Sequence, residues 1–200
     1  RAWKRNLDND GTFLGFILLG LCPIWHPSVM FNKNEIIGVG GYDVSFGPAE
    51  DYELFSRIAM SRLKTTIVPH FHLLVRIHDG SQSFKNQKKQ NDLTKKAHRI
   101  VLSKFVQENN VNKVAALLLL EKRFKSEKLN KNSIIELANK LNEMFDCIVV
   151  KQQFSSDELR SLKTKIYRRI GYGFYIAPLL NKVPEKLFYF ILFISSPLYF

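Results

Sequence analysis

The pattern of apolar and polar positions predicts a helix, a short strand and a second helix in the first forty residues. Residues 11–25 are almost all apolar. This stretch contains Pro23 and has about fifteen residues, fewer than the ~20 that a membrane-spanning helix needs. We therefore expect a buried helix that leads into a loop. Residues 28–31 have the character of a core strand, and residues 33–37 predict a short helix that ends at Gly38.

Helical spacing resumes at Pro48, a residue that suits a first helical position. Apolar side chains then recur at three- and four-residue spacing, at Tyr52, Phe55, Ile58 and Ala59. Glu50 and Asp51 fall in the first turn, where unpaired amides and the helix dipole favour negative charge. The pair can simply stabilise the helix, or it can keep an ionised carboxylate ready to accept a proton.

The second half of the chain has a strand pattern followed by helical patterns. Alternation over residues 66–78 predicts a strand with His70, His72, Arg76 and His78 on one face. Helical spacing follows in the later half of 84–110 and over 111–125. Capping boxes at Ser133 to Glu136 and at Ser155 to Glu158 predict two more helices, at about 133–150 and 156–170.

Five short motifs occur in a fixed order: HPSVMF at 26–31, GGYD at 40–43, EDYEL at 50–54, VRIH at 75–78 and SQS at 81–83. Across residues 17–84 this set resembles the acceptor-side half of family 2 glycosyltransferases. The resemblance implies an α/β fold, the C-terminal part of a GT-A nucleotide-diphospho-sugar transferase fold, followed by an α-helical appendage.

The resemblance also implies roles for five residues at the centre of this region. Asp51 takes the position of the general base for the acceptor hydroxyl, and Glu50 that of its helper in orienting the hydroxyl. Gly40 and Gly41 take the position of a loop beside the donor sugar, and glycine lets a ligand approach the backbone closely. Asp43 takes the position of an acceptor contact.

The implied cofactor is a divalent metal, Mg²⁺ or Mn²⁺. In the family, Arg76 and His78 correspond to residues near the diphosphate and its metal, so His78 is a candidate metal ligand. Residues 8–10, Asp-Asn-Asp, spell the Asp-x-Asp pattern of the family's metal site. A basic stretch precedes them instead of an apolar strand, so we predict a turn or helix cap there and expect the true Asp-x-Asp upstream of Arg1.

Composition indicates a globular protein with an anionic partner. The 200 residues are 46% apolar and 24% charged, and the net charge is +12. Such basicity suits an anionic membrane surface, a nucleotide diphosphate or nucleic acid. Nucleic acid is disfavoured because the lysines of residues 85–99 lack interleaved aromatic residues. Cys22 and Cys147 are isolated, which favours a reducing cytoplasm over a disulfide framework.

We predict three regions: 1–84 as the transferase half, 85–170 as a helical appendage and 171–200 as an aromatic, apolar tail. A basic stretch at 163–169 precedes the tail, a pattern typical of peripheral attachment to the cytoplasmic face of an inner membrane. A packed C-terminal helix and a truncated spanning helix are the alternatives for the tail.

The expected function is that of an inverting glycosyltransferase that moves a sugar from a nucleotide-sugar donor to a hydroxyl of a saccharide or lipid-linked acceptor. The expected setting is the synthesis of cell-surface polysaccharide or lipopolysaccharide. Because the chain opens at Arg1 without an initiator methionine, we expect it to be part of a larger protein. The resemblance places the nucleotide-binding half before this chain, so we expect the chain alone to be inactive. The alternative is a non-catalytic, membrane-attached basic module that binds a saccharide or an anionic ligand.

Overall fold

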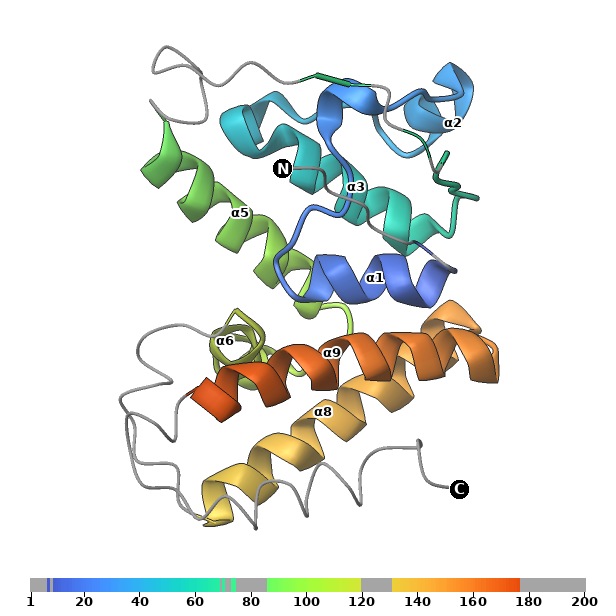
Figure 1. Cartoon of the computed structure of the whole chain (residues 1–200). Coiled ribbons are helices and arrows are strands. Elements are labelled where there is room, and N and C mark those ends of the chain that lie inside the picture. Colours follow the sequence, from blue (N-terminus) through green and yellow to red (C-terminus); the bar gives the residue numbers. More distant parts are fainter. Residues whose placement is uncertain are drawn as a thin grey trace.

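The computed structural model describes residues 7, 9–68, 70, 73–74, 86–119 and 131–176. This part of the chain is mostly helical (Figure 1). Its elements, in chain order, are α1 (Asp10–Leu18), the 3₁₀ helix η1 (His26–Ser28), α2 (Lys33–Gly38), the 3₁₀ helix η2 (Val44–Ala49), α3 (Glu50–Ser61), α5 (Gln87–Leu102), α6 (Glu108–Leu118), α8 (Lys131–Gln152) and α9 (Ser156–Ile176).

The predicted α/β fold of GT-A type is wrong, because the described residues contain helices and no β-strand. Residues 28–31 illustrate the physical reason. A short apolar run forms a strand only when a neighbouring strand pairs with its backbone. Here Ser28 closes η1, residues 29–31 continue as irregular chain, and the Met30 side chain is 98% exposed. Of the strand predicted over 66–78, the described positions 66–68, 70, 73 and 74 also lack strand structure.

The predicted buried N-terminal helix is confirmed as α1. The Asn9 side chain caps this helix by accepting a hydrogen bond from the backbone N–H of Thr12, at 3.0 Å. Asp10 follows in the first turn, where the helix dipole favours an acidic side chain. The helix cap predicted at residues 8–10 is therefore confirmed at Asn9, whereas Asp8 lies outside the described residues. Every residue from Gly11 to Leu18 is buried.

Two glycines of α1 let it approach α9 closely. A Cβ atom added to Gly11 would overlap the backbone carbonyl of Glu158, and one added to Gly15 would lie 3.1 Å from the side chain of Lys165. In the same region the Asn9 side-chain amide donates to the Ser161 hydroxyl at 3.0 Å. α1 lies alongside α9 (Figure 1), and the missing side chains of its two glycines bring residues as far as 152 positions apart in the sequence into contact.

One hydrophobic core joins the early and the late helices. Its fully buried large side chains come from α1, α3, α5, α6, α8 and α9: Phe13, Phe55, Phe145, Leu14, Ile17, Leu18, Leu54, Leu102, Leu118, Met144, Ile148 and Leu162. At about 25 cal/mol for each square ångström of apolar surface removed from water, such burial is the main favourable term for folding. The core crosses the predicted boundary between residues 84 and 85, and the boundaries themselves stay predictions.

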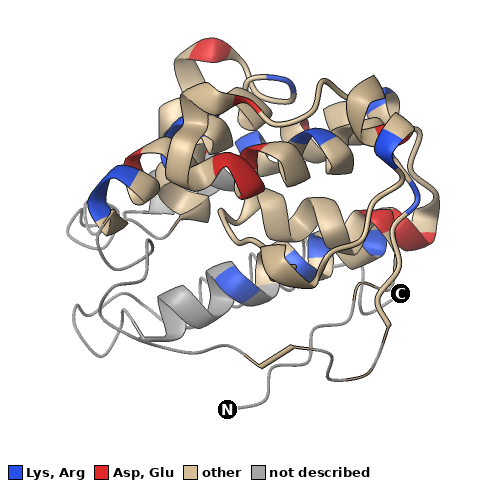
Figure 2. Ribbon diagram, turned by 90° about the horizontal axis from the view of Figure 1, so that it is seen from above, with Lys and Arg blue, Asp and Glu red and all other residues tan. Residues whose placement is uncertain are grey.

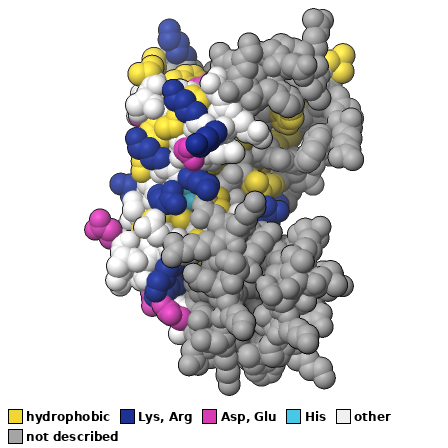
Figure 3. Space-filling model, turned by 90° about the vertical axis from the view of Figure 1, so that its left-hand side faces the viewer, with side chains coloured by type: hydrophobic (Ala, Val, Ile, Leu, Met, Phe, Trp, Pro, Cys, Tyr) yellow, Lys and Arg dark blue, Asp and Glu magenta, His cyan; other side chains and the backbone are white. Residues whose placement is uncertain are grey.

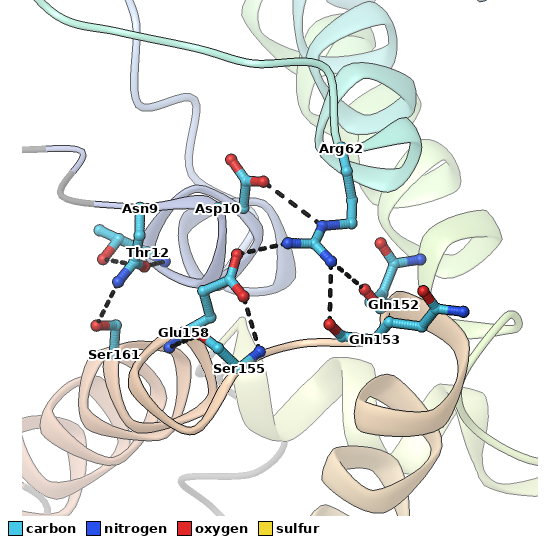
Figure 4. Close-up of polar contacts among 9 residues, drawn as sticks. All are labelled: Asn9, Asp10, Thr12, Arg62, Gln152, Gln153, Ser155, Glu158 and Ser161. Atoms are coloured by element: carbon cyan, nitrogen blue, oxygen red, sulfur yellow. Dashed lines mark hydrogen bonds and ion pairs between the residues drawn. The ribbon is translucent and has the colours of Figure 1, made fainter.

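Arg62 fastens the end of α3 to the turn between α8 and α9 (Figure 4). Its guanidinium donates to the Gln152 carbonyl at 2.7 Å and to the Gln153 carbonyl at 3.1 Å. It also pairs with the Glu158 carboxylate at 2.7 Å. A guanidinium suits this position because its planar fork of five N–H donors can bond several acceptors at once.

The later helices lie where helical patterns were predicted, but their bounds differ: α5 begins well before the later half of 84–110, α6 ends at Leu118, and residues 120–125 of its prediction lie outside the described residues. α5 and α6 begin at Gln87 and Glu108, and α9 begins at Ser156. The second predicted capping box is confirmed, since the Ser155 N–H donates to Glu158 Oε2 at 2.8 Å and the Glu158 N–H donates to Ser155 Oγ at 3.3 Å. α8 begins at Lys131, two residues before the box predicted at Ser133. Among the described helices, none combines the length and apolar character needed to cross a bilayer.

Candidate functional site

The candidate site is the acidic start of α3 together with the loop that faces it. Three acidic side chains, Glu50, Asp51 and Glu53, occupy the first turn of α3, as predicted for the first two. The residue before the helix, Ala49, has no side chain that could cap it. Instead, Asp51 Oδ1 accepts a hydrogen bond from the Tyr52 backbone N–H at 2.7 Å. Figure 2 marks the acidic residues along the ribbon in red.

Glu50 carries the clearest sign of unused binding capacity. Its Oε2 atom is buried and accepts no hydrogen bond within the described part of the chain. A buried acceptor without a donor is costly, by about 1–3 kcal/mol. A hydroxyl placed against Glu50 would remove that cost, so the carboxylate is suited to hold a hydroxyl-bearing ligand.

Tyr42 and His26 form a hydrogen-bonded pair beside the two carboxylates. The Tyr42 hydroxyl and His26 Nε2 lie 2.7 Å apart, and the ring centroids are separated by 5.6 Å. Partial burial raises the pKa of Tyr42 above its ordinary value, and the negative charges of Glu50 and Asp51 raise it further. The phenol therefore keeps its proton near the carboxylates, while the residue as a whole remains 44% exposed.

Gly40 and Gly41 have a structural explanation. Both adopt positive φ, 97° and 64°, which glycine tolerates and most residues do not. They end α2, with the Gly40 N–H donating to the Ile37 carbonyl at 2.9 Å and the Gly41 N–H donating to the Ile36 carbonyl at 2.8 Å. A Cβ atom on Gly41 would meet nothing within 4 Å. The glycines are therefore required by the turn, and the space beside Gly41 is open.

Arg57 ties this turn to α3. Its guanidinium donates to the backbone carbonyls of Val39 and Gly41 and pairs with Glu53 at 2.6 Å. Hydrogen bonding to Glu53 raises the pKa of Arg57 from an already high value, so the guanidinium stays charged. Through these bonds one side chain of α3 fixes the position of the loop that carries Tyr42.

Asp43 caps η2. Its Oδ1 atom accepts a hydrogen bond from the Ser45 N–H at 2.8 Å. The hydrogen bonds from Ser45 hold the pKa of Asp43 below its ordinary value, and the charges of Arg57 and Lys96 act in the same direction. The carboxylate is thus ionised and already partly occupied, which leaves its predicted acceptor contact a prediction.

Two predicted site residues, Arg76 and His78, lie outside the described residues. Within the described part, no three His, Cys, Asp or Glu side chains come together in a way that could hold a metal ion. The predicted divalent metal, with His78 as its candidate ligand, therefore stays a prediction.

Sequence reasoning placed Glu50 and Asp51 correctly in the first turn but missed two features of the site. The contact of His26 with Tyr42 joins positions sixteen residues apart, and the bonds of Arg57 reach sixteen and eighteen residues back. One signal for the role of Tyr42 was available in the sequence. This aromatic residue directly follows the glycine pair, and a tight turn at the pair holds the residue after it in a fixed position. Nothing in the local pattern around Arg57 indicated its role.

Comparison with known proteins adds no relative. No model of a known protein family matches the chain, and no match was found among curated proteins or solved structures. The assignment to family 2 glycosyltransferases is contradicted by the helical, strand-free architecture of the described residues, and no family match supports it.

Proposed function

We propose that this chain acts in glycosyl transfer by binding a hydroxyl-bearing acceptor at the start of α3. The support is the chemistry of the site and not the fold. The buried, unpartnered Glu50 Oε2 carries the proposal, because it is an acceptor that a ligand hydroxyl would satisfy. A saccharide, which offers several hydroxyls on one rigid ring, fits a site with two carboxylates and a phenol.

Asp51 is the proposed general base. It lies in the first turn of α3, where its Oδ1 atom accepts a hydrogen bond from the Tyr52 N–H at 2.7 Å. In the proposed reaction the Asp51 carboxylate takes the proton of the acceptor hydroxyl. At the same time the oxygen of that hydroxyl attacks the anomeric carbon of a nucleotide sugar. The bond from that carbon to the nucleoside diphosphate breaks, so the configuration at the carbon inverts. Glu50 and the protonated Tyr42 orient the hydroxyl.

The test is Asp51→Asn in the protein that contains this chain. Release of nucleoside diphosphate from a panel of nucleotide sugars is measured with saccharide acceptors present. Removal of a general base typically costs 10²- to 10⁴-fold in rate, so we expect turnover to fall by about a hundredfold or more while the donor still binds.

The matched control is Asp146→Asn, which removes the same charge from an exposed position on α8. This variant should keep full turnover. Equal turnover by the Asp51→Asn variant and the native protein would overturn the proposed role of Asp51. If the native protein and the Asp51→Asn variant both bind the saccharide but neither turns over any donor, the proposed catalysis is overturned. The acidic start of α3 then serves the alternative function of a non-catalytic binding module.

A further inference from the structure

Positive charge is concentrated on α5. Within sixteen residues this helix carries five cationic side chains and one acidic one, Asp92. The cationic residues are Lys88, Lys89, Lys95, Lys96 and Arg99. Figure 3 shows the face of the molecule that lies on the left in Figure 1, the side on which α5 is drawn, and Lys and Arg side chains gather there.

The first two lysines of α5 are not explained by the stability of the helix. The amino end of a helix carries a partial positive charge, which favours acidic and disfavours basic side chains. α5 has no acidic residue in its first turn, and Asn86 makes no side-chain capping bond. Lys88 and Lys89 therefore lie where they weaken the helix slightly. α3, by contrast, begins with three acidic residues.

Lys88 and Lys89 also form no ion pair within the described part of the chain. α5 packs into the core through Ala97, His98, Val101 and Leu102. Lys88 and Lys89 are exposed, and neither pairs with a described acidic side chain. Two unpaired cations at the unfavourable end of a helix are the expected arrangement for a surface that meets an anionic partner.

The charged face continues to the edge of the candidate site. Lys96, about two turns further along the helix, lies with its Nζ atom 5.0 Å from the centre of the Phe46 ring. Its charge also contributes to the lowered pKa of Asp43. A partner that covers α5 would therefore lie next to the loop that leads into Glu50 and Asp51.

We propose that the exposed face of α5 docks the protein on an anionic phospholipid bilayer. A helix of sixteen residues is about 24 Å long, which presents its cations along a line that a flat surface of headgroups can meet. Four of the five cations are lysines, which interact with phosphate as point charges. The sequence of α5 has no Phe, Tyr or Trp, so it offers no stacking platform for single-stranded nucleic acid. Ile100, 47% exposed, adds apolar surface.

This proposal is independent of the proposed function, although the two agree in one respect. Docking through α5 would hold the acidic start of α3 close to the bilayer surface, where a lipid-linked acceptor would present its hydroxyl. The two proposals can fail separately, because Asp51→Asn should remove catalysis without removing docking and K88Q/K89Q should weaken docking without removing the general base.

The test is sedimentation with vesicles of phosphatidylcholine that contain phosphatidylglycerol and with vesicles of phosphatidylcholine alone. We expect the chain to bind only the anionic vesicles, and less tightly as salt is added. Each lysine close to an anionic surface is worth about fivefold in affinity, so the double variant K88Q/K89Q should bind about thirtyfold more weakly. Its melting temperature should be unchanged or higher, because cations at the amino end of a helix are removed.

The control variant K33Q/K64Q removes the same charge from two exposed lysines outside α5 and should bind about as well as the native chain. Three outcomes would overturn the proposal. The chain could bind neither vesicle, the two variants could lose the same affinity, or K88Q/K89Q could keep its affinity for vesicles while losing affinity for a duplex or single-stranded RNA. The last outcome would assign the face to nucleic acid.

Discussion

α1 and the segment at residues 25–45 are neighbours in the sequence but have opposite environments. Every α1 side chain from Gly11 to Leu18 is buried against other helices. In the segment that follows, Met30 is 98% and Val44 92% exposed. Only part of the segment reaches the core, through the partly buried side chains Val29, Phe31, Ile36 and Val39. Polar contacts hold the rest, among them the bonds from Arg57 and the pair of His26 with Tyr42.

Stability and the open side of the candidate site therefore depend mostly on different residues, although α3 contributes to both. Burial of apolar surface supports the fold, and it is concentrated where α1 meets α9 and α3. The residues around Tyr42 contribute few buried contacts, so their substitution should change ligand binding more than unfolding. Substitutions in the buried helix contacts should therefore destabilise the fold strongly, and substitutions in the segment at residues 25–45 should destabilise it little.

Gly11→Ala should be the most destabilising change. The new methyl group would overlap the Glu158 carbonyl, and the backbone of α9 cannot move away as a flexible side chain could. We expect a loss of about 3 kcal/mol in the free energy of unfolding, measured by chemical denaturation. Gly38→Ala is the control, since a Cβ atom there meets nothing within 4 Å and should leave stability almost unchanged. Equal effects of the two substitutions would contradict the close helix contact.

Arg62→Ala should cost about 2 kcal/mol, because the Glu158 carboxylate and the carbonyls of Gln152 and Gln153 would all lose a donor. The control is Arg160→Ala. Arg160 is mostly exposed and pairs with Asp157 at 3.7 Å, a surface contact worth between 0 and about 1 kcal/mol. Thermal unfolding of both variants would show whether the link from α3 to the turn between α8 and α9 stabilises the molecule.

Glu158→Gln should cost about 1 kcal/mol at neutral pH. Burial raises the pKa of Glu158, but hydrogen bonds from Ser155 and the charge of Arg62 lower it more, so the net pKa lies below the ordinary 4.5. A carboxyl with a lowered folded pKa stabilises the fold above its unfolded pKa and loses that effect as pH falls through the folded value. The native chain and the variant should therefore converge in stability below pH 4.5. A difference that persists in strong acid would be evidence against this ion pair.

Met30→Ser should have the smallest effect, within about 0.5 kcal/mol, because a nearly fully exposed side chain removes almost no apolar surface from water. Denaturation midpoints of the native chain and the variant should coincide. A large loss of stability would show that the open segment packs against something in solution, and the proposed separation of the two regions would then fail.

Local sequence signals predicted much of the helical structure but not the architecture. Asn9 before α1, the glycine pair after α2 and Ser155 before α9 all act on backbone groups within a few residues. The predicted strand at 28–31 was wrong because strand formation depends on a partner that a local pattern cannot specify. The acidic pair of the site was visible in the sequence, whereas its phenol neighbour and the buried state of Glu50 Oε2 were not.

Local sequence was enough to indicate the caps of α1 and α9, the acidic start of α3 and the positive charge of α5, because a cap or a run of charges is complete within one or two helical turns. Only the tertiary structure decided which elements meet. The contact of Asn9 with Ser161 spans 152 positions, and that of Arg62 with Glu158 spans 96. Such pairs form when the whole apolar core assembles, and the periodicity of neither segment encodes its partner.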